Sequence, residues 1–248
     1  MSNVVLEIKN LSKSYNFGTY NFERFVNIIK SIWNKEHELK NKFQAIDSIN
    51  LKLHKGEAIA ILGKNGYGKS TLCRLLSKIT SLDKGEIRIN GKIIPVLALN
   101  LGIQLETSGH ENIYFLGSML GIKKKIIDKK LNSILDFSNL TEFLDTPLKK
   151  YSSGMVTRLI FSTLINFPGD IYILDEVLAV SDQSFKNKSI NLMKKKIKSG
   201  SSIIFISHEE KIIRQFCKYA YVFTHKGKLS ERLKINEAIK LYQKTLKK

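Results

Sequence analysis

Gly63-Lys64-Asn65-Gly66-Tyr67-Gly68-Lys69-Ser70 fits the pattern G-x-x-x-x-G-K-[ST], and it stands between an apolar, strand-like run and a segment that favours helix. Glycines without side chains let successive backbone N–H groups converge on phosphate oxygens at a helix N-terminus, where the helix dipole favours anions. The stretch therefore predicts a loop that binds the phosphates of a nucleotide. Tyr67 is bulky for its place, so we expect a local adjustment of the loop.

Individual residues of this loop have predictable roles. Lys69 is expected to bridge the β- and γ-phosphates, and the Ser70 hydroxyl is expected to ligate Mg²⁺, which neutralises charge on the transferred phosphoryl group. The predicted phosphate-binding set is Gly63, Asn65, Gly66, Gly68, Lys69, Ser70 and Thr71.

Strand-like and helical patterns alternate along the rest of the chain, which is typical of an α/β protein with a mostly parallel sheet covered by helices. Strands are expected at 4–11, 46–53, 57–62, 86–97, 171–174, 202–206 and 219–224, and helices from Lys69 and over 183–198, 209–217 and 235–246.

Two regions interrupt this alternation. Residues 109–166 read as almost entirely helical. We therefore expect a single domain, 1–248, whose nucleotide-binding core, 1–103 and 167–248, carries an inserted helical subdomain, 104–166, that contains the Ser-Ser-Gly motif. Residues 20–40 form an amphipathic pattern, with Phe25, Ile29 and Trp33 on one face. That face either packs on the domain itself or lies against a membrane partner or lipid headgroups.

A second motif, which is acidic, follows the apolar run Ile171-Tyr172-Ile173-Leu174. A buried strand of this form delivers Asp175 and Glu176 at its carboxyl end, where doubly wound sheets bind ligands. Asp175 is expected to hold the Mg²⁺ shell, and Glu176 is expected to polarise the attacking water.

Composition excludes several classes of protein. Apolar residues make up 43% of the 248, but no apolar run approaches the length of a membrane-spanning helix, and the first residues lack a secretory pattern, so a cytoplasmic location is expected. Cys73 and Cys217 are expected to be buried, reduced thiols. The net charge of +19 leaves open several interpretations, which are binding to nucleic acid, to an anionic membrane surface or to an acidic substrate, or a merely solvated lysine-rich exterior.

Tyr151-Ser152-Ser153-Gly154-Met155, with Arg158, resembles the signature sequence of the ABC ATPase family, and it lies between the phosphate-binding loop and Asp175 as in that family. The resemblance implies a P-loop NTPase fold of the ABC type with an N-terminal antiparallel β region. It also implies that ATP, with Mg²⁺, is the substrate. The further landmarks that it implies are Tyr15, which stacks on adenine; Gln104, a Mg²⁺ ligand and catalytic residue; Ser181-Asp182, the D-loop; and His208, the switch histidine.

In that family two subunits form a dimer, and the signature residues of one close over the nucleotide of the other. The resemblance therefore implies a homodimer in which Ser152, Ser153 and Gly154 act in trans, with Glu176, His208 and Gln104 in catalysis and Ser70, Gln104 and Asp175 around the metal.

A narrower resemblance covers most of the chain and is to exporters of capsular polysaccharide, O-antigen or teichoic acid. It is carried by residues 101–112, by the Tyr-Ser-Ser-Gly-Met motif, by residues 175–182, and by the insertion before Phe43; Ser108 and His110 depart from the pattern. It implies a separate membrane permease and a peripheral place on the cytoplasmic face of the bacterial inner membrane. The chain ends at Lys248, so no appended glycan-binding domain is expected.

Two other functions remain open at this point. One is an ABC subunit that exports a lipid, a peptide or a drug. The other is a nucleic-acid-associated ABC ATPase, but neither the very long coiled coil between loop and signature nor the second cassette of such proteins occurs here. We therefore expect no nucleic-acid partner.

Overall fold

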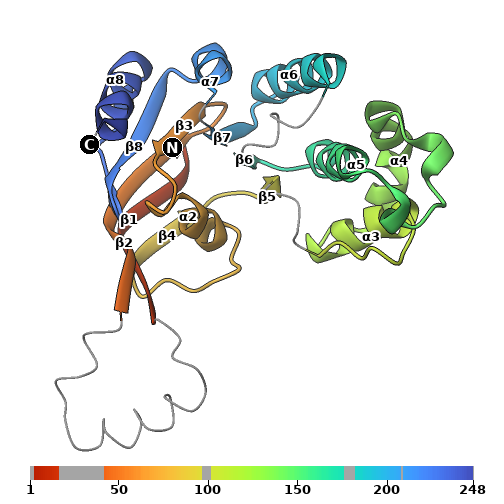
Figure 1. Ribbon diagram of the computed structural model, residues 1–248, viewed down its shortest axis with the longest axis horizontal. Helices are drawn as coiled ribbons and strands as arrows, with labels where there is room; N and C mark the ends of the chain where they lie inside the picture. The colour runs from red at the N-terminus through yellow and green to blue at the C-terminus, as the bar shows by residue number, and fades with distance from the viewer. Residues whose placement is uncertain (1–2, 17–41, 97–101, 176–181, 208, 248) are drawn as a thin grey trace, which may run out of the picture.

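Two β-sheets and a set of helices form the part of the chain that the computed structural model describes, residues 3–16, 42–96, 102–175, 182–207 and 209–247 (Figure 1). The smaller sheet is antiparallel and has the order β2 (Lys42–His54), β1 (Val4–Asn16), β4 (Lys84–Ile89). The larger sheet has the order β10 (Leu233–Lys234), β8 (Tyr219–His225), β3 (Ala58–Gly63), β7 (Ser202–Ile206), β6 (Ile171–Asp175), β5 (Ile93–Val96), with β9 (Lys228–Leu229) paired to β8.

The centre of the larger sheet is parallel, as predicted: β3 pairs with β7 and β8, and β6 pairs with β5 and β7, all in parallel. Every residue of β3 is buried, because Ala58, Ala60 and Leu62 face one hydrophobic core and Ile59 and Ile61 face another. A strand covered on both faces consists of consecutive apolar residues, which explains the uninterrupted apolar run of β3 in the sequence.

The predicted strand over 86–97 is wrong, since the chain breaks there into β4 and β5, which belong to different sheets. The break falls at Gly91, which has φ of 122° and lies so close to Asp170 that a Cβ would meet its side chain at 2.6 Å. Lys92 then donates its backbone N–H to Asp170 Oδ2 at 2.6 Å, which fixes the start of β5. Only glycine fits this crossing between sheets.

The helices are α2 (Lys69–Leu76), α3 (Gly109–Met119), α4 (Lys124–Ser138), α5 (Ser153–Asn166), α6 (Gln183–Lys198), α7 (Glu210–Phe216) and α8 (Ile235–Leu246), with two 3₁₀ turns, Thr141–Phe143 and Leu148–Lys150. Figure 1 shows α3, α4 and α5 together at one side of the larger sheet, between β5 and β6 in the chain. We call these three helices the helical segment; the boundaries predicted for its subdomain stay a prediction.

Several expectations about single elements are confirmed. The predicted helices over 183–198 and 235–246 match α6 and α8, and Ile239 and Tyr242 face inward from α8. Cys73 and Cys217 are buried free thiols, and burial raises the pKa of both. The amphipathic stretch 20–40 lies outside the described residues. Within the described ranges, no helix combines the length and apolar character needed to cross a membrane.

Lys196 gives a pH-dependent prediction. Its Nζ donates to the Tyr172 hydroxyl at 2.6 Å, and burial, with the charge of Lys130 as a second cause, lowers its pKa from 10.5 to about 8. Between about pH 8 and pH 10.5, Lys196 is protonated in the unfolded chain but largely neutral in the folded chain. The free energy of unfolding should therefore rise with pH over this range. We expect Lys196→Met to raise the free energy of unfolding by on the order of 2 kcal/mol at pH 7 and by much less at pH 10. Urea unfolding of both proteins at the two pH values measures this, and an equal gain at both would contradict it.

Candidate nucleotide-binding site

The phosphate-binding loop connects β3, which ends at Gly63, to α2, which begins at Lys69. Gly66 and Gly68 have φ of 78° and 115°, in the left-handed region that side chains other than glycine rarely adopt. At Gly68 a Cβ would also lie 2.6 Å from the carbonyl oxygen of Ala45. The glycines of the motif therefore satisfy both the backbone conformation and the close packing of the loop.

Lys69 is 8% exposed and turns back into this loop. Its Nζ donates to the carbonyl oxygens of Gly63 at 2.5 Å and Lys64 at 3.1 Å, and it lies 3.5 Å from Asn65 Oδ1. The ammonium is thus held by neutral carbonyl oxygens at the centre of the loop. A phosphate oxygen placed there would receive the same donors with a full negative charge in return.

A pocket of about 330 Å³ opens beside the loop and is lined by Phe43, Ala45, Asn65, Gly66, Gly68, Lys69, Ser70, Thr71 and Asp175. The structure therefore brings together most of the predicted phosphate-binding set and the carboxylate of Asp175. Asp175 reaches the pocket because β6 and β3 end at the same edge of the parallel sheet, with β7 between them. Hydroxyl and carboxylate oxygens, as at Ser70 and Asp175, are the hard ligands that Mg²⁺ prefers.

A larger cavity, of about 500 Å³, lies at the opposite end of β3, and His54, Glu57 and Arg232 are among its lining residues. There the Glu57 carboxylate accepts from Arg232 Nη2 at 2.5 Å and from the His54 backbone N–H at 3.0 Å. The Glu57 carboxylate is thus already paired with a cation, and the glycine loop does not line this cavity. The smaller pocket is therefore the better candidate for the nucleotide.

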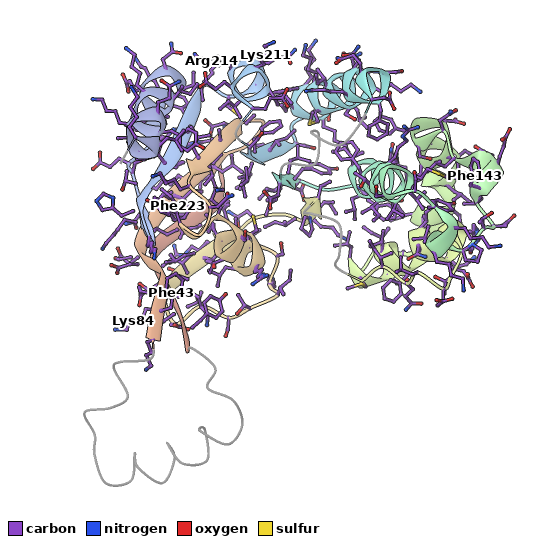
Figure 2. All side chains as sticks on the ribbon, in the orientation of Figure 1. Phe43, Lys84, Phe143, Lys211, Arg214 and Phe223 are labelled. Atoms are coloured by element: carbon purple, nitrogen blue, oxygen red, sulfur yellow. The ribbon has the colours of Figure 1, made fainter. Side chains whose placement is uncertain are left out.

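The pocket contains an aromatic residue, Phe43, that the sequence analysis did not select. Phe43 belongs to β2 and faces Tyr15 of β1 across the antiparallel pair, with Lys226 Nζ 6.0 Å from its ring centroid. Figure 2 labels Phe43 in the part of the molecule that holds α2. Tyr15, the predicted adenine contact, is not among the lining residues, and its buried hydroxyl has no hydrogen-bond partner within the described residues. Tyr15 and Phe43 are separated by the insertion in the sequence, so their pairing could not be predicted from neighbouring residues.

The bulky Tyr67 is accommodated by packing outward from the loop. Its side chain lies partly buried against the core between the two sheets, and its carbonyl oxygen accepts the Gly227 N–H at 3.1 Å. Gly227 in turn accepts the Asp47 N–H at 2.9 Å, so the turn after β8 fastens the loop to β2. Phe223 of β8, labelled in Figure 2, packs under the loop, where a Cβ on Gly63 would meet it at 2.7 Å.

The Ser-Ser-Gly motif forms the beginning of α5. Ser152 is the N-cap, since its side chain accepts the Met155 N–H at 3.2 Å, and both Ser152 and Ser153 are exposed. Neither lines the pocket that holds the phosphate-binding loop of the same chain. The structure therefore does not bring the two motifs together within one subunit.

Gln104 is likewise absent from the pocket lining. Its backbone is held by the buried Asn112, whose Oδ1 accepts the Gln104 N–H at 3.0 Å and whose Nδ2 donates to the Gln104 carbonyl at 2.9 Å. Asn112 was not singled out in the sequence. The capping box of α3, between Ser108 and Glu111, sets this turn, so the departure at Ser108 from the exporter pattern still forms a regular helix start.

The remaining predicted residues divide into two groups. Asp182 is described and is the N-cap of α6, with its side chain accepting the Phe185 N–H at 2.9 Å. Glu176, Ser181 and His208 lie outside the described residues. In the described ranges, no group of three or more His, Cys, Asp or Glu side chains is arranged to hold a metal ion.

A parallel sheet with a glycine loop at its carboxyl edge, a lysine in that loop and a carboxylate on a neighbouring strand defines a P-loop nucleotide-binding protein. Residues 46–179 match the sequence profile of the ABC transporter family. The chain belongs to this family, and it is of the ATP-hydrolysing subunit type.

Relatives and solved structures agree with this assignment. The chain is 37% identical over 205 residues to the O-antigen export system ATP-binding protein RfbB of Klebsiella pneumoniae, covering 83% of each chain. It is 37% identical over 246 residues to the teichoic acids export ATP-binding protein TagH of Staphylococcus epidermidis, covering 98% of this chain and 90% of the relative. An ATP-binding subunit of an ABC transporter aligns with a TM-score of 0.77 at 17% identity, covering 98% of this chain and 99% of that one. A dimeric ATP-binding cassette bound to ADP and phosphate aligns with a TM-score of 0.74 at 18% identity, covering 93% and 98%. These likenesses confirm the predicted fold.

Proposed function

We propose that this chain is the ATPase subunit of an exporter that moves a lipid-linked polysaccharide, such as O-antigen, capsule or teichoic acid, through a separate membrane permease. This substrate class is supported by two relatives, named as ATP-binding proteins of O-antigen export and of teichoic acid export, to which the chain is 37% identical over most of both chains. The chain would lie peripherally at the cytoplasmic face of the bacterial inner membrane, bound to the permease.

The active form that we propose is a homodimer with two composite ATP sites. The observation that carries it is that Ser152 and Ser153 are exposed at the start of α5 and do not line the pocket of their own phosphate-binding loop. A second copy would present Ser152, Ser153 and Gly154 to that pocket. Hydroxyl and backbone N–H donors would then complete a water-excluded site, which stabilises the transferring phosphoryl group through position and charge.

Within each pocket the roles follow from chemistry. Lys69 would leave the loop carbonyls and bind the β- and γ-phosphates, while the N–H groups of Gly66 to Thr71 bind phosphate oxygens. Ser70 and Asp175 would hold Mg²⁺, which when bound neutralises charge on the phosphoryl group. Glu176 would orient the water, His208 would contact the γ-phosphate, and Gln104 would be a further ligand of the metal.

The adenine contact that we propose involves Phe43 as well as Tyr15. We expect Phe43→Ala to raise the KM for ATP about 10-fold with kcat within about 2-fold, because stacking on a base contributes on the order of 1–3 kcal/mol. Tyr15→Phe, which removes only the hydroxyl, should leave both constants near wild type. Steady-state ATPase kinetics of the two variants measure this. A larger KM change in Tyr15→Phe than in Phe43→Ala would contradict it.

ATP hydrolysis measured over a range of protein concentrations tests the two-subunit site. With Mg²⁺, wild-type activity should rise more steeply than linearly with protein, and Glu176→Gln should abolish turnover and trap an ATP-bound dimer in size-exclusion chromatography. Hydrolysis strictly proportional to protein and unaffected by Glu176→Gln would overturn the proposal.

The exported substrate needs a cellular test. In cells that lack this chain, surface glycan should be lost and lipid-linked glycan should accumulate; the wild-type chain should restore export, and Lys69→Met should not. Normal surface glycan in the deleted cells, with loss of export of a lipid, a peptide or a drug, would favour the other exporter class.

A further inference from the structure

A buried aromatic cluster joins the helical segment to α6. Phe137 of α4, Phe161 of α5 and Phe185 of α6 pack together, with ring centroids 5.3 Å apart for Phe137 and Phe185 and 5.6 Å apart for Phe161 and Phe185. Phe161 and Phe185 are almost completely buried. Because close-packed rings tolerate little sliding, this cluster fixes where α6 lies against α5.

Arg158 adds a charged contact at the edge of this cluster. It lies on α5, about two turns after Ser152, and its Nη2 donates to Asp182 Oδ2 at 2.6 Å. Its guanidinium carbon is 5.5 Å from the centroid of the Phe185 ring, within range of a cation–π contact. One arginine therefore contacts both the first turn of α6 and the residue that caps it.

Asp182 uses its two carboxylate oxygens for different partners. Oδ1 accepts the Phe185 N–H at 2.9 Å and caps α6, whereas Oδ2 pairs with Arg158. The hydrogen bond from the Phe185 N–H, and then the charge of Arg158, lower the pKa of Asp182. The cap of α6 and the helix of the Ser-Ser-Gly motif are thus joined through one side chain.

The Arg158 guanidinium is only partly satisfied by its contacts. Its Nε atom is buried and has no hydrogen-bond partner within the described residues. A buried donor without an acceptor costs folding free energy, and an arginine at a partly exposed position could extend into water instead. The guanidinium is instead held against Asp182 and the ring of Phe185.

We propose that Arg158 is a positioning residue that makes α5, with Ser152 to Gly154 at its start, move together with Asp182 at the start of α6. This inference rests on the proposed two-subunit site, because it is there that the exposed Ser-Ser-Gly motif meets the partner's nucleotide. The position of the motif is then tied, through the Arg158–Asp182 pair, to the first turn of α6 in the same subunit. Arg158 itself touches no nucleotide.

The test compares Arg158→Met, Arg158→Lys, Asp182→Asn and the double variant Arg158→Met/Asp182→Asn in the full-length chain. Asparagine remains a good N-cap, so Asp182→Asn removes the charge of the pair and keeps the α6 cap. We expect Arg158→Met and Asp182→Asn each to lower kcat about 10-fold with the KM for ATP within about 2-fold, since positioning is lost and binding is not. Arg158→Lys should recover part of kcat, and the double variant should be no slower than either single variant.

Arg214→Met is the matched control. Arg214 lies on α7 (Figure 2), pairs with Glu210 at 3.4 Å and donates to Asn236 at 2.5 Å, and its side chain makes no hydrogen bond or ion pair with α5 or α6 among the described residues. Its kcat should stay within about 2-fold of wild type. A kcat near wild type in Asp182→Asn, or strictly multiplicative losses in the double variant, would overturn the role of Arg158. If wild-type activity is itself proportional to protein and no ATP-bound dimer forms, the two-subunit site fails instead.

Discussion

Lys69→Met is expected to lower kcat for ATP hydrolysis at least ~100-fold, which is the usual loss when one positioned donor to a transition-state oxyanion is removed. The structure gives the physical reason. The ammonium lies buried in the loop, where it donates to the carbonyl oxygens of Gly63 and Lys64 and lies 3.5 Å from Asn65 Oδ1, so it is placed where a phosphate bound by the loop would meet it. Methionine keeps the length of the side chain and loses the charge.

Lys64→Met provides the control within the same loop. Its backbone carbonyl accepts from Lys69, but its side chain is absent from the pocket lining, so activity should stay within about 3-fold of wild type. Both variants should be assayed with saturating ATP, and circular dichroism should verify folding. Equal losses in the two variants would mean that general positive charge, and not the placed ammonium, supports hydrolysis.

Asp175→Asn is expected to lower kcat about 100-fold at ordinary Mg²⁺ concentration and to raise the Mg²⁺ concentration needed for half-maximal activity. Asparagine has nearly the same shape, so the packing of the pocket should be kept. A charged oxygen ligand is replaced by a neutral one, which weakens attraction for the cation. A titration of ATPase activity with Mg²⁺ measures both quantities, and binding of a fluorescent ATP analogue without Mg²⁺ shows whether the pocket is intact.

Asp170→Asn serves as the control for Asp175→Asn. Asp170 precedes the opposite end of β6, where it accepts the Lys92 N–H at 2.6 Å, and an asparagine oxygen accepts the same bond. Its Mg²⁺ dependence should equal that of the wild type. If Asp170→Asn shifts the Mg²⁺ requirement as much as Asp175→Asn does, the metal is not held at Ser70 and Asp175.

The predictions that held came from motifs whose geometry is encoded locally. Gly66 and Gly68 specify left-handed backbone, the lysine and serine that follow begin a helix, and the apolar run before Asp175 is a strand buried on both faces. The order of the loop, the Ser-Ser-Gly motif and the acidic strand along the chain then indicated the ABC ATPase family. Each motif depends on residues within a few positions of one another, so it can be predicted without knowledge of tertiary contacts.

Contacts between distant segments were decided by the tertiary structure. Phe43 lines the pocket because the β1–β2 register sets it opposite Tyr15, and the expected strand over 86–97 divides because Gly91 crosses between sheets against Asp170. The Arg158–Asp182 pair and the aromatic cluster likewise depend on how α5 and α6 pack. Sheet register and helix packing sum many weak contacts over the whole chain, and no short stretch of sequence records their outcome.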